Sequence, residues 1–261
     1  MATYLDAILA VHRERCASDG RDLEGLRRAC EAMPSAPSFE EALRSPSFGV
    51  IAEVKRRSPV RGSMSEEEVH PAAIAADYQA GGAAAISVLT DTPHFGGSMD
   101  DLSAVVDAVT IPVLRKDFLL SERDLCDARL YGAGAALLIA AAMDQERLVQ
   151  LIRWSSLIGL ELLLEVHDPR ELAGLDLAAL EFHGALGINQ RDLVTFTVDS
   201  SRALACREQL GHQFPVVAES GVRSPQDAHA LAAGGYDAVL VGEMLMRARD
   251  RRAGVKALCA G

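Results

Sequence analysis

The sequence predicts a single (β/α)8 TIM barrel that follows an N-terminal helical extension, and three observations support this fold class. The chain has 261 residues, which fits one barrel of this kind or two smaller domains. From residue 49 onward, short apolar runs alternate with amphipathic stretches, without a break in composition. The apolar runs are continuous, as expected for parallel strands that are buried on both faces.

The first 48 residues differ from the rest, because they are rich in Arg, Glu and Ala and contain no β-branched runs. A first helix is predicted here, because several residues share one helical face. These residues are Leu5, Ile8, Leu9 and His12. Further helices are predicted over residues 23–33 and 39–43. We therefore expect residues 1–48 to cap a barrel formed by residues 49–261.

Eight apolar runs are predicted to be the strands of the barrel. They cover residues 50–54, 84–88, 112–115, 135–140, 161–165, 184–188, 215–218 and 238–241. Their starts lie roughly 23 to 34 residues apart, which is the length of one strand and one crossover helix. The alternative, a doubly wound open sheet, would more often show a Gly-rich phosphate loop after its first strand, and residues 53–58 contain no glycine.

Helix start signals follow several of the strands. Pro71 opens a helix over residues 71–80 at a first-turn position. Ser121 is followed three residues later by an acidic residue, and Ser224 precedes a proline. A long amphipathic helix is predicted over residues 144–158, and another is expected to begin at residues 167–169.

Composition and charge argue against several classes of function. The net charge is −11 and the basic residues are scattered, so nucleic acid is not an expected partner. The longest uncharged apolar run, residues 133–143, is too short to span a bilayer, and the first residues do not follow the signal-peptide pattern. Five cysteines without a C-x-x-C spacing suggest free thiols in a reducing cytoplasm.

Charged and amide side chains stand at the downstream ends of the predicted strands. They are Glu53, Lys55, Lys116, Glu165, Asn189, Arg191 and Glu219. In a closed parallel barrel these ends meet on one rim, and that rim carries the chemistry of such barrels. The sequence therefore predicts a functional site that is built from the ends of separate strands.

The residue types at this rim suit acid–base chemistry on an anionic substrate. Glu53 and Lys55 point to the same side of an extended strand, where they would form an ion pair. A lysine in a partly dry pocket, such as Lys116, can act as general acid, base or nucleophile, although a solvated surface charge is the alternative. Glu165 is expected to have a raised pKa in an apolar mouth, or else simply to pair with Lys116. Arg191 suits a carboxylate.

Two glycine-containing loops follow the last two strands, at the usual phosphate site of this barrel class. The loops contain Ser220 with Gly221, and Gly242 with Glu243. Glycine allows backbone N–H groups to approach phosphate oxygens. The seven histidines show no metal-binding spacing, so no metal is expected.

Taken together, these segments resemble the indole-3-glycerol phosphate synthase family over about residues 50–248. The motifs that carry the resemblance are residues 51–55 with Ser58, Pro59 and Gly62, residues 86–90 with Phe95 and 97–98, residues 114–118, 132–133 with 137–139, 164–167, 187–189 with 191–193 and 195–196, 218–221, and 241–242. The helical extension also looks like that of this family, in which it covers part of the barrel mouth.

The resemblance implies an enzyme without a cofactor that acts on 1-(2-carboxyphenylamino)-1-deoxyribulose 5-phosphate. Such an enzyme closes the indole ring and releases carbon dioxide and water. By the family match, Lys116 would be the general acid at the ribulose carbonyl oxygen and Glu165 the base for dehydration. Glu53 and Lys55 would hold or polarise the substrate, and Glu219 would orient the ribulose hydroxyls or Lys116.

The resemblance also implies the binding residues. Ser58, Asn189 and Arg191 would contact the anthranilate part of the substrate, Phe95, Phe118 and Leu193 would sandwich its aromatic ring, and Ser220, Gly221, Gly242 and Glu243 would lie at its phosphate. One departure concerns Glu243, since many members of the family have Ser there and a carboxylate repels phosphate. The backbone N–H can still bind if the side chain turns away.

Two other functions remain open at this point. A non-catalytic barrel that binds a phosphorylated metabolite would share the fold, and so would a sugar-phosphate isomerase or a Schiff-base aldolase. An aldolase predicts borohydride trapping at Lys116, which the synthase does not. We expect a monomer, with a weak homodimer as the alternative.

Overall fold

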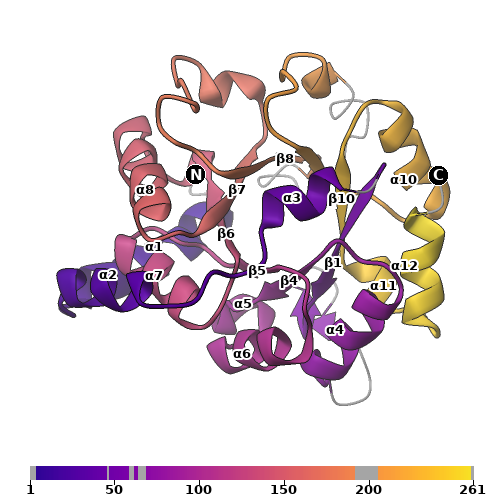
Figure 1. Cartoon of the computed structure of the whole chain (residues 1–261), viewed down its shortest axis with the longest axis horizontal. Coiled ribbons are helices and arrows are strands. Elements are labelled where there is room, and N and C mark those ends of the chain that lie inside the picture. Colours follow the sequence, from indigo (N-terminus) through magenta and orange to yellow (C-terminus); the bar gives the residue numbers. More distant parts are fainter. Residues whose placement is uncertain (1–3, 46, 59–61, 64–68, 192–204, 260–261) are drawn as a thin grey trace.

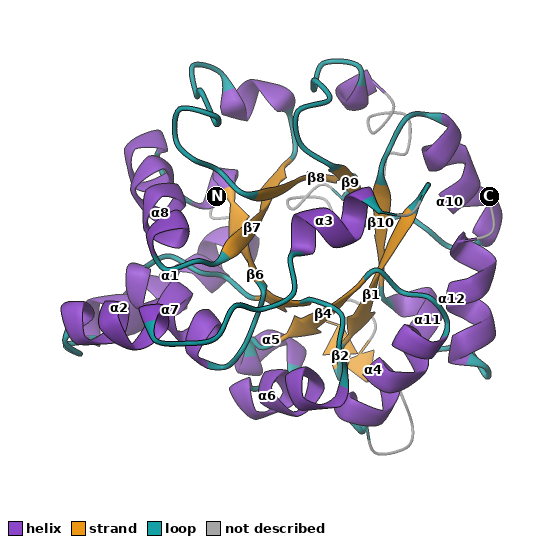
Figure 2. Cartoon of the chain, viewed as in Figure 1, coloured by secondary structure: helices purple, strands orange, loops and turns teal. Residues whose placement is uncertain are grey.

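The computed structural model describes residues 4–45, 47–58, 62–63, 69–191 and 205–259, without the side chains of Tyr4, Ser58 and Ser63. Within them, eight parallel strands form a closed barrel in the order β1-β10-β9-β8-β7-β6-β5-β4 (Figures 1 and 2). The strands are β1 (Gly49–Val54), β4 (Ala85–Leu89), β5 (Val113–Lys116), β6 (Ala135–Ile139), β7 (Glu161–Val166), β8 (Gly184–Asn189), β9 (Val216–Glu219) and β10 (Ala238–Val241). The predicted fold is confirmed, and each predicted strand end lies within one residue of the observed one.

Helices surround the barrel as an outer layer (Figure 2). They are α4 (Pro71–Ala80), α5 (Thr92–Phe95), α6 (Met99–Ala108), α7 (Glu122–Leu130), α8 (Gln145–Leu157), α10 (Pro225–Ala233), α11 (Glu243–Met246) and α12 (Arg251–Cys259), with short 3-10 helices η1 (Ala140–Ala142) and η2 (Pro169–Leu172). Two antiparallel strands of two residues each, β2 (Arg57–Ser58) and β3 (Gly62–Ser63), follow β1. Ser121 and Ser224 form capping boxes, as their sequence pattern predicts.

The helix expected at residues 167–169 is one 3-10 turn, η2. Asp168 and Glu171 form a capping box around it, so the start signal in the sequence is real. The hydrogen bond from the backbone N–H of Ala173 to the carbonyl of Arg170 closes the turn, and Ala173 then turns to an extended conformation. The predicted helix start is therefore confirmed, and the helix is one turn long because a good N-cap starts a helix but does not extend it.

Two layers of apolar side chains hold the barrel together. Residues such as Ile51, Leu114 and Leu163 fill the interior of the barrel, while their neighbours in the strands pack outward against the helices. Because side chains alternate along a strand, a residue two positions after an interior one also faces inward. Glu53, Lys116 and Glu165 stand in this position, and the fold thus directs them into the barrel mouth.

The N-terminal extension contacts both ends of the barrel. It consists of α1 (Tyr4–Ser18), α2 (Leu23–Glu31) and α3 (Phe39–Arg44) within the described residues. In α3, Phe39 and Leu43 are fully buried at the end where the strands begin, and the helix lies across the near end of the barrel in Figure 1. On the opposite rim, the Arg13 side chain of α1 donates a hydrogen bond to the carbonyl of Ala142, just after β6 (3.1 Å).

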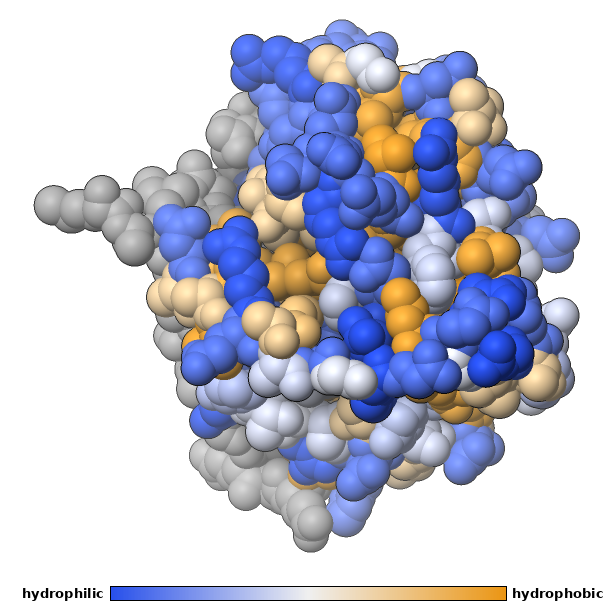
Figure 3. Space-filling model, turned by 90° about the vertical axis from the view of Figure 1, so that its left-hand side faces the viewer, coloured by the Kyte–Doolittle hydropathy of each residue, from blue (hydrophilic) through white to orange (hydrophobic). Residues whose placement is uncertain are grey.

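The surface on the side of α2 and α8 is largely hydrophilic, with apolar residues in separate patches (Figure 3). Among the described residues, the exposed large apolar side chains are Val11, Tyr131 and Leu157. No helix of the described residues is both long and apolar enough to span a bilayer. All five cysteines lie in the described ranges, and none of them forms a disulfide, as expected.

Candidate active site

Lys116 lies at the centre of a buried charge cluster at the carboxyl ends of the strands. Its Nζ donates to Oε2 of Glu219 at the end of β9 (2.9 Å) and contacts Oε2 of Glu165 in β7 (3.4 Å). The lysine side chain is 16 % exposed, and the two carboxylates are nearly inaccessible. One ammonium group therefore bridges two carboxylates in a largely dry pocket.

Asn189 and His167 complete the surroundings of Glu165. Nδ2 of Asn189, at the end of β8, donates to Oε1 of Glu165 (2.9 Å), and Nε2 of His167 lies 3.9 Å from the same oxygen. Oδ1 of Asn189 accepts a hydrogen bond from the backbone N–H of Arg191 (3.0 Å). The amide is held from both ends, so it fixes the direction in which the carboxylate of Glu165 points.

Glu53 and Lys55 form the expected ion pair, with 2.8 Å between Nζ and Oε1. The pair lies against Gly242 in the loop after β10, where an added Cβ would collide with both side chains. Gly187 in β8 has the same relation to Glu219, since a Cβ there would collide with the carboxylate. These two glycines leave the space that the charged side chains occupy.

Burial and charge act against each other in this cluster. Burial by itself lowers the pKa of Lys116, but the carboxylates of Glu219, Glu165 and Glu53 outweigh it, and the pKa of Lys116 lies above its ordinary value. Burial raises the pKa of Glu219 to about 8 despite the nearby ammonium, and the charge of Glu165 adds to the rise. At neutral pH the cluster thus holds a charged lysine beside a carboxyl group that prefers to keep its proton.

The expected raised pKa of Glu165 is wrong. Burial does raise it, but Lys116, His167 and the hydrogen bond from Asn189 together hold the pKa of Glu165 below its ordinary value. The apolar strand before Glu165 predicted the burial correctly. The three partners come from other segments or from beyond the strand, and they reverse the direction of the shift.

The two predicted phosphate loops differ in backbone conformation. Ser220 (φ +67°) and Gly221 (φ +84°) both adopt left-handed conformations after β9, which is uncommon for a residue with a side chain. Gly242 is the N-cap of α11. The carboxylate of Glu243 pairs with Arg247, the C-cap of α11 (3.5 Å), so its side chain has a partner at the end of its own helix.

The predicted aromatic residues lie together beside the cluster. The rings of Phe95 and Phe118 have centroids 6.4 Å apart and are tilted by 35°, so they pack on each other. Leu193 and the side chain of Ser58 lie outside the described residues, and Arg191 is described as a half-buried residue at the start of that gap.

Sequence reasoning missed two histidines of this region. His167 lies two positions after Glu165, and the same-side rule for extended residues points to it. His12 of α1 packs its ring on Phe118, with centroids 5.4 Å apart. Its place on the apolar face of the first helix predicts that it faces inward, but nothing in the sequence identifies the loops that it contacts.

Comparison with known proteins identifies the family of this chain. The family model described as indole-3-glycerol phosphate synthase matches residues 5–258. The chain is similar to indole-3-glycerol phosphate synthase 2 of Streptomyces coelicolor (45 % identity, 89 % of this chain and 89 % of the relative). It is also similar to the indole-3-glycerol phosphate synthases of Streptomyces griseus (46 %, 91 % and 87 %) and Mycobacterium leprae (42 %, 97 % and 93 %).

Similar solved structures support the fold alone. Thiamine phosphate pyrophosphorylase from Pyrococcus furiosus superposes with a TM-score of 0.59 at 16 % identity, covering 81 % of this chain and 94 % of that one. Such low identity carries no argument about activity. The family model and the similar relatives, in contrast, match nearly the whole chain. The protein accordingly belongs to the indole-3-glycerol phosphate synthase family, the decarboxylating lyases of tryptophan biosynthesis.

Proposed function

We propose that this protein converts 1-(2-carboxyphenylamino)-1-deoxyribulose 5-phosphate into indole-3-glycerol phosphate, carbon dioxide and water, with Lys116 as general acid and Glu165 as general base. The observation that carries the assignment of roles is the placement of one buried ammonium group within reach of two buried carboxylates at the barrel rim. Ring closure needs a proton donor and dehydration needs a proton acceptor, and this cluster offers one of each.

Lys116 suits the first step. As the ring carbon that bears the carboxylate attacks the ribulose carbonyl, the carbonyl oxygen becomes negative and takes a proton from Nζ. The pKa of Lys116 lies above its ordinary value, and Glu165 beside it is ionised at neutral pH, so the ammonium proton is present when the substrate arrives. Loss of carbon dioxide then leaves its electron pair in the ring system.

Glu165 suits the later step. Dehydration expels the new hydroxyl group as water, and a proton must leave the ring system to restore aromaticity. The lowered pKa of Glu165 supports its role as the acceptor, because the carboxylate is ionised at neutral pH. Asn189 would hold that carboxylate in position through its hydrogen bond. Each such contribution is typically about 10²–10⁴-fold in rate.

The remaining site residues would bind and orient the substrate. Glu53, Lys55 and Glu219 would contact the ribulose part or adjust Lys116, Arg191 and Ser58 would bind the anthranilate carboxylate, and Phe95, Phe118 and Leu193 would pack on its ring. The phosphate would lie on the backbone of Ser220, Gly221 and Gly242. The ion pair between Glu243 and Arg247 supports a role for the Glu243 backbone rather than for its carboxylate.

We also propose residues 1–48 as a capping extension of a catalytic barrel formed by residues 49–261. The burial of Phe39 and Leu43 of α3 supports this division. We expect a monomer, with a weak homodimer as the alternative. Because the net charge is −11, we expect no binding of nucleic acid.

The test is the appearance of indole fluorescence when the purified protein meets the proposed substrate, together with the amount of carbon dioxide released. We expect one equivalent of indole-3-glycerol phosphate and one of carbon dioxide for each substrate molecule consumed. A folded protein that binds the substrate without forming product would contradict the enzyme and support a metabolite-binding barrel. Borohydride in the presence of substrate tests the aldolase, for which trapping at Lys116 would be the signature, and we expect none.

A further inference from the structure

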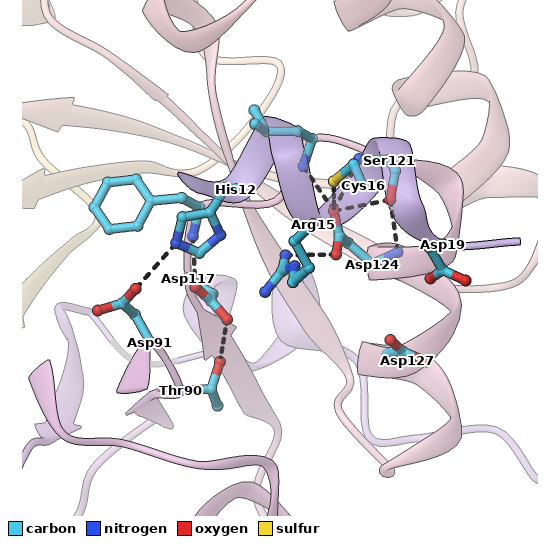
Figure 4. A network of polar contacts seen from close by, with 12 residues as sticks. His12, Arg15, Cys16, Asp19, Thr90, Asp91, Asp117, Ser121, Asp124 and Asp127 are labelled. Carbon is cyan, nitrogen blue, oxygen red and sulfur yellow. Dashed lines mark hydrogen bonds and ion pairs between the residues drawn. The ribbon is translucent and has the colours of Figure 1, made fainter. Parts of the chain in front are cut away.

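His12 of α1 contacts the loops after β4 and β5, both far from it in the sequence, and Figure 4 shows its link to Asp91 in the first of them. Its Nε2–H donates to Oδ1 of Asp91, in the loop after β4, at 3.0 Å. Both residues are buried, with exposed fractions of 3 % and 2 %. A hydrogen bond between two buried polar groups 79 residues apart fixes α1 relative to that loop.

Asp91 in turn fixes the segment that carries Phe95. As the N-cap of α5, it accepts hydrogen bonds from the backbone N–H groups of His94 (2.8 Å) and Phe95 (3.2 Å). Burial raises the pKa of Asp91, but the hydrogen bonds from His12 and His94 outweigh it and hold the pKa at about 2. The carboxylate is therefore charged, and it links the imidazole of His12 to the backbone of Phe95.

The other contact of His12 is with Phe118, in the loop after β5. The two rings have centroids 5.4 Å apart and an interplanar angle of 54°. The backbone N–H of Phe118 donates to its neighbour Asp117 (2.8 Å), and Lys116 lies two residues before Phe118. His12 is thus linked to Phe95 through Asp91, and it contacts Phe118 directly.

The side chains of His12, Asp91 and Asp117 each offer an atom that could bind a metal ion. These atoms lie within 4.8 Å of one another. Asp117 already accepts hydrogen bonds from Arg115, Thr90 and Phe118. The carboxylate oxygens of Asp91 likewise have donors, as described above. The carboxylate oxygens of this group thus already have donors, which favours a structural link over a metal site. Nδ1 of His12 is buried and has no hydrogen-bond partner among the described residues.

We propose that His12 is a positioning residue that sets the relative placement of Phe95 and Phe118, the wall against which the aromatic ring of the substrate would pack. This inference rests on the proposed function. The ring and the N–H group of His12 do separate work, since the ring contacts Phe118 and the N–H group holds Asp91. Neither group reaches the reacting atoms, so their loss affects binding of the aromatic part more than the chemical step.

Three variants separate these contributions. His12→Phe keeps a ring against Phe118 but has no donor for Asp91, His12→Gln keeps an N–H donor but has no ring, and His12→Ala has neither. Aromatic contacts are typically worth about 0.5–1.5 kcal/mol, so we expect KM to rise about 2- to 13-fold in His12→Ala. The rise should be smaller in the other two variants, with kcat little changed. Glu14→Ala, on an exposed position of the same helix, is the matched control.

Binding of two probes distinguishes positioning from a general loss of structure. We expect His12→Ala to weaken binding of indole-3-glycerol phosphate, which carries the ring, and to leave binding of inorganic phosphate unchanged. The proposal would be overturned if the wild type and all three variants bound indole-3-glycerol phosphate with equal affinity. It would also be overturned if His12→Phe and His12→Gln lost affinity equally for indole-3-glycerol phosphate and for inorganic phosphate. If His12→Ala does not fold, these two variants decide. A wild type that forms no product would instead overturn the proposed function.

Discussion

Arg115 and Lys116 are neighbours in β5, and their side chains enter two different buried charge networks. Arg115 points outward, where its guanidinium donates to Asp117, Thr90 and the carbonyl of Asp124 at 2.8–3.1 Å. Lys116 points into the barrel, where it faces Glu165 and Glu219. Both networks are dry, but they differ in how completely their polar atoms are paired.

In the outer network, both oxygens of Asp117 accept hydrogen bonds. In the inner network, Oε1 of Glu219 is buried and has no hydrogen-bond partner among the described residues. A complete set of partners holds a charge in one place, while an incomplete one leaves room for substrate atoms and for a proton to move. We infer that the outer network serves the fold and the inner one the chemistry.

The largest expected effect is on Glu165→Gln. Glutamine fills the same volume but cannot accept the proton that leaves during dehydration. We expect kcat to fall by about 10²–10⁴-fold, with the fold retained, in the indole-fluorescence assay. Glu161→Gln at the opposite end of β7 is the control and should keep its activity. Near wild-type activity of Glu165→Gln would show that another group is the base.

The next effect concerns the outer network. Asp117→Ala leaves the buried guanidinium of Arg115 without its counter-ion, and breaking a buried pair from one side typically costs about 3–5 kcal/mol. The free energy of unfolding in urea should fall by this amount, and by less in Asp117→Asn, which keeps one acceptor. Equal stability of Asp117→Ala and the wild type would mean that the outer network is not structural.

A smaller loss is expected for Gly187→Ala. The added Cβ would displace the carboxylate of Glu219 and thereby the ammonium group that it holds. A misplacement of about 1 Å can cost about 10²-fold in rate, so we expect kcat to fall by about 10- to 100-fold. Gly211→Ala is the matched control, because nothing lies within 4 Å of the added atom. Equal kcat values for the two variants would show that the position of Glu219 does not matter.

The smallest effect is on a pH profile. Because the pKa of Glu219 is raised to about 8, the group is neutral below that pH and charged above it. The additional charge repels an anionic substrate, so kcat/KM of the wild type should fall as the pH rises through about 8. Glu219→Gln is neutral throughout and should lack this inflection. An inflection of the same size in the variant would assign it to another group.

The sequence predicts the barrel well because the signals for it are local. Continuous apolar runs identify the strands, and the alternation of side chains places Glu53, Lys116 and Glu165 on the inner face. Barrel closure then brings their ends together without further information. The same reasoning predicts the ion pair between Glu53 and Lys55, which lie two residues apart.

What the sequence does not predict depends on contacts between distant segments. The lowered pKa of Glu165 depends on Lys116 and Asn189, from two other strands. The partners of His12 are 79 and 106 positions away, and no periodicity identifies them. The extension was expected at the barrel mouth, where α1 contacts the rim, but α3 also closes the other end, because Phe39 and Leu43 pack on apolar side chains of the barrel interior.

The most direct test of the division between the two networks compares Arg115→Met and Lys116→Met, two changes at adjacent positions that remove one buried cation each. We measure kcat by indole fluorescence and stability by urea unfolding. We expect Lys116→Met to lose at least about 100-fold in kcat, and Arg115→Met to lose the larger part of about 3–5 kcal/mol in stability while its folded form stays active. An active Lys116→Met, or an Arg115→Met as stable as the wild type, would contradict the account.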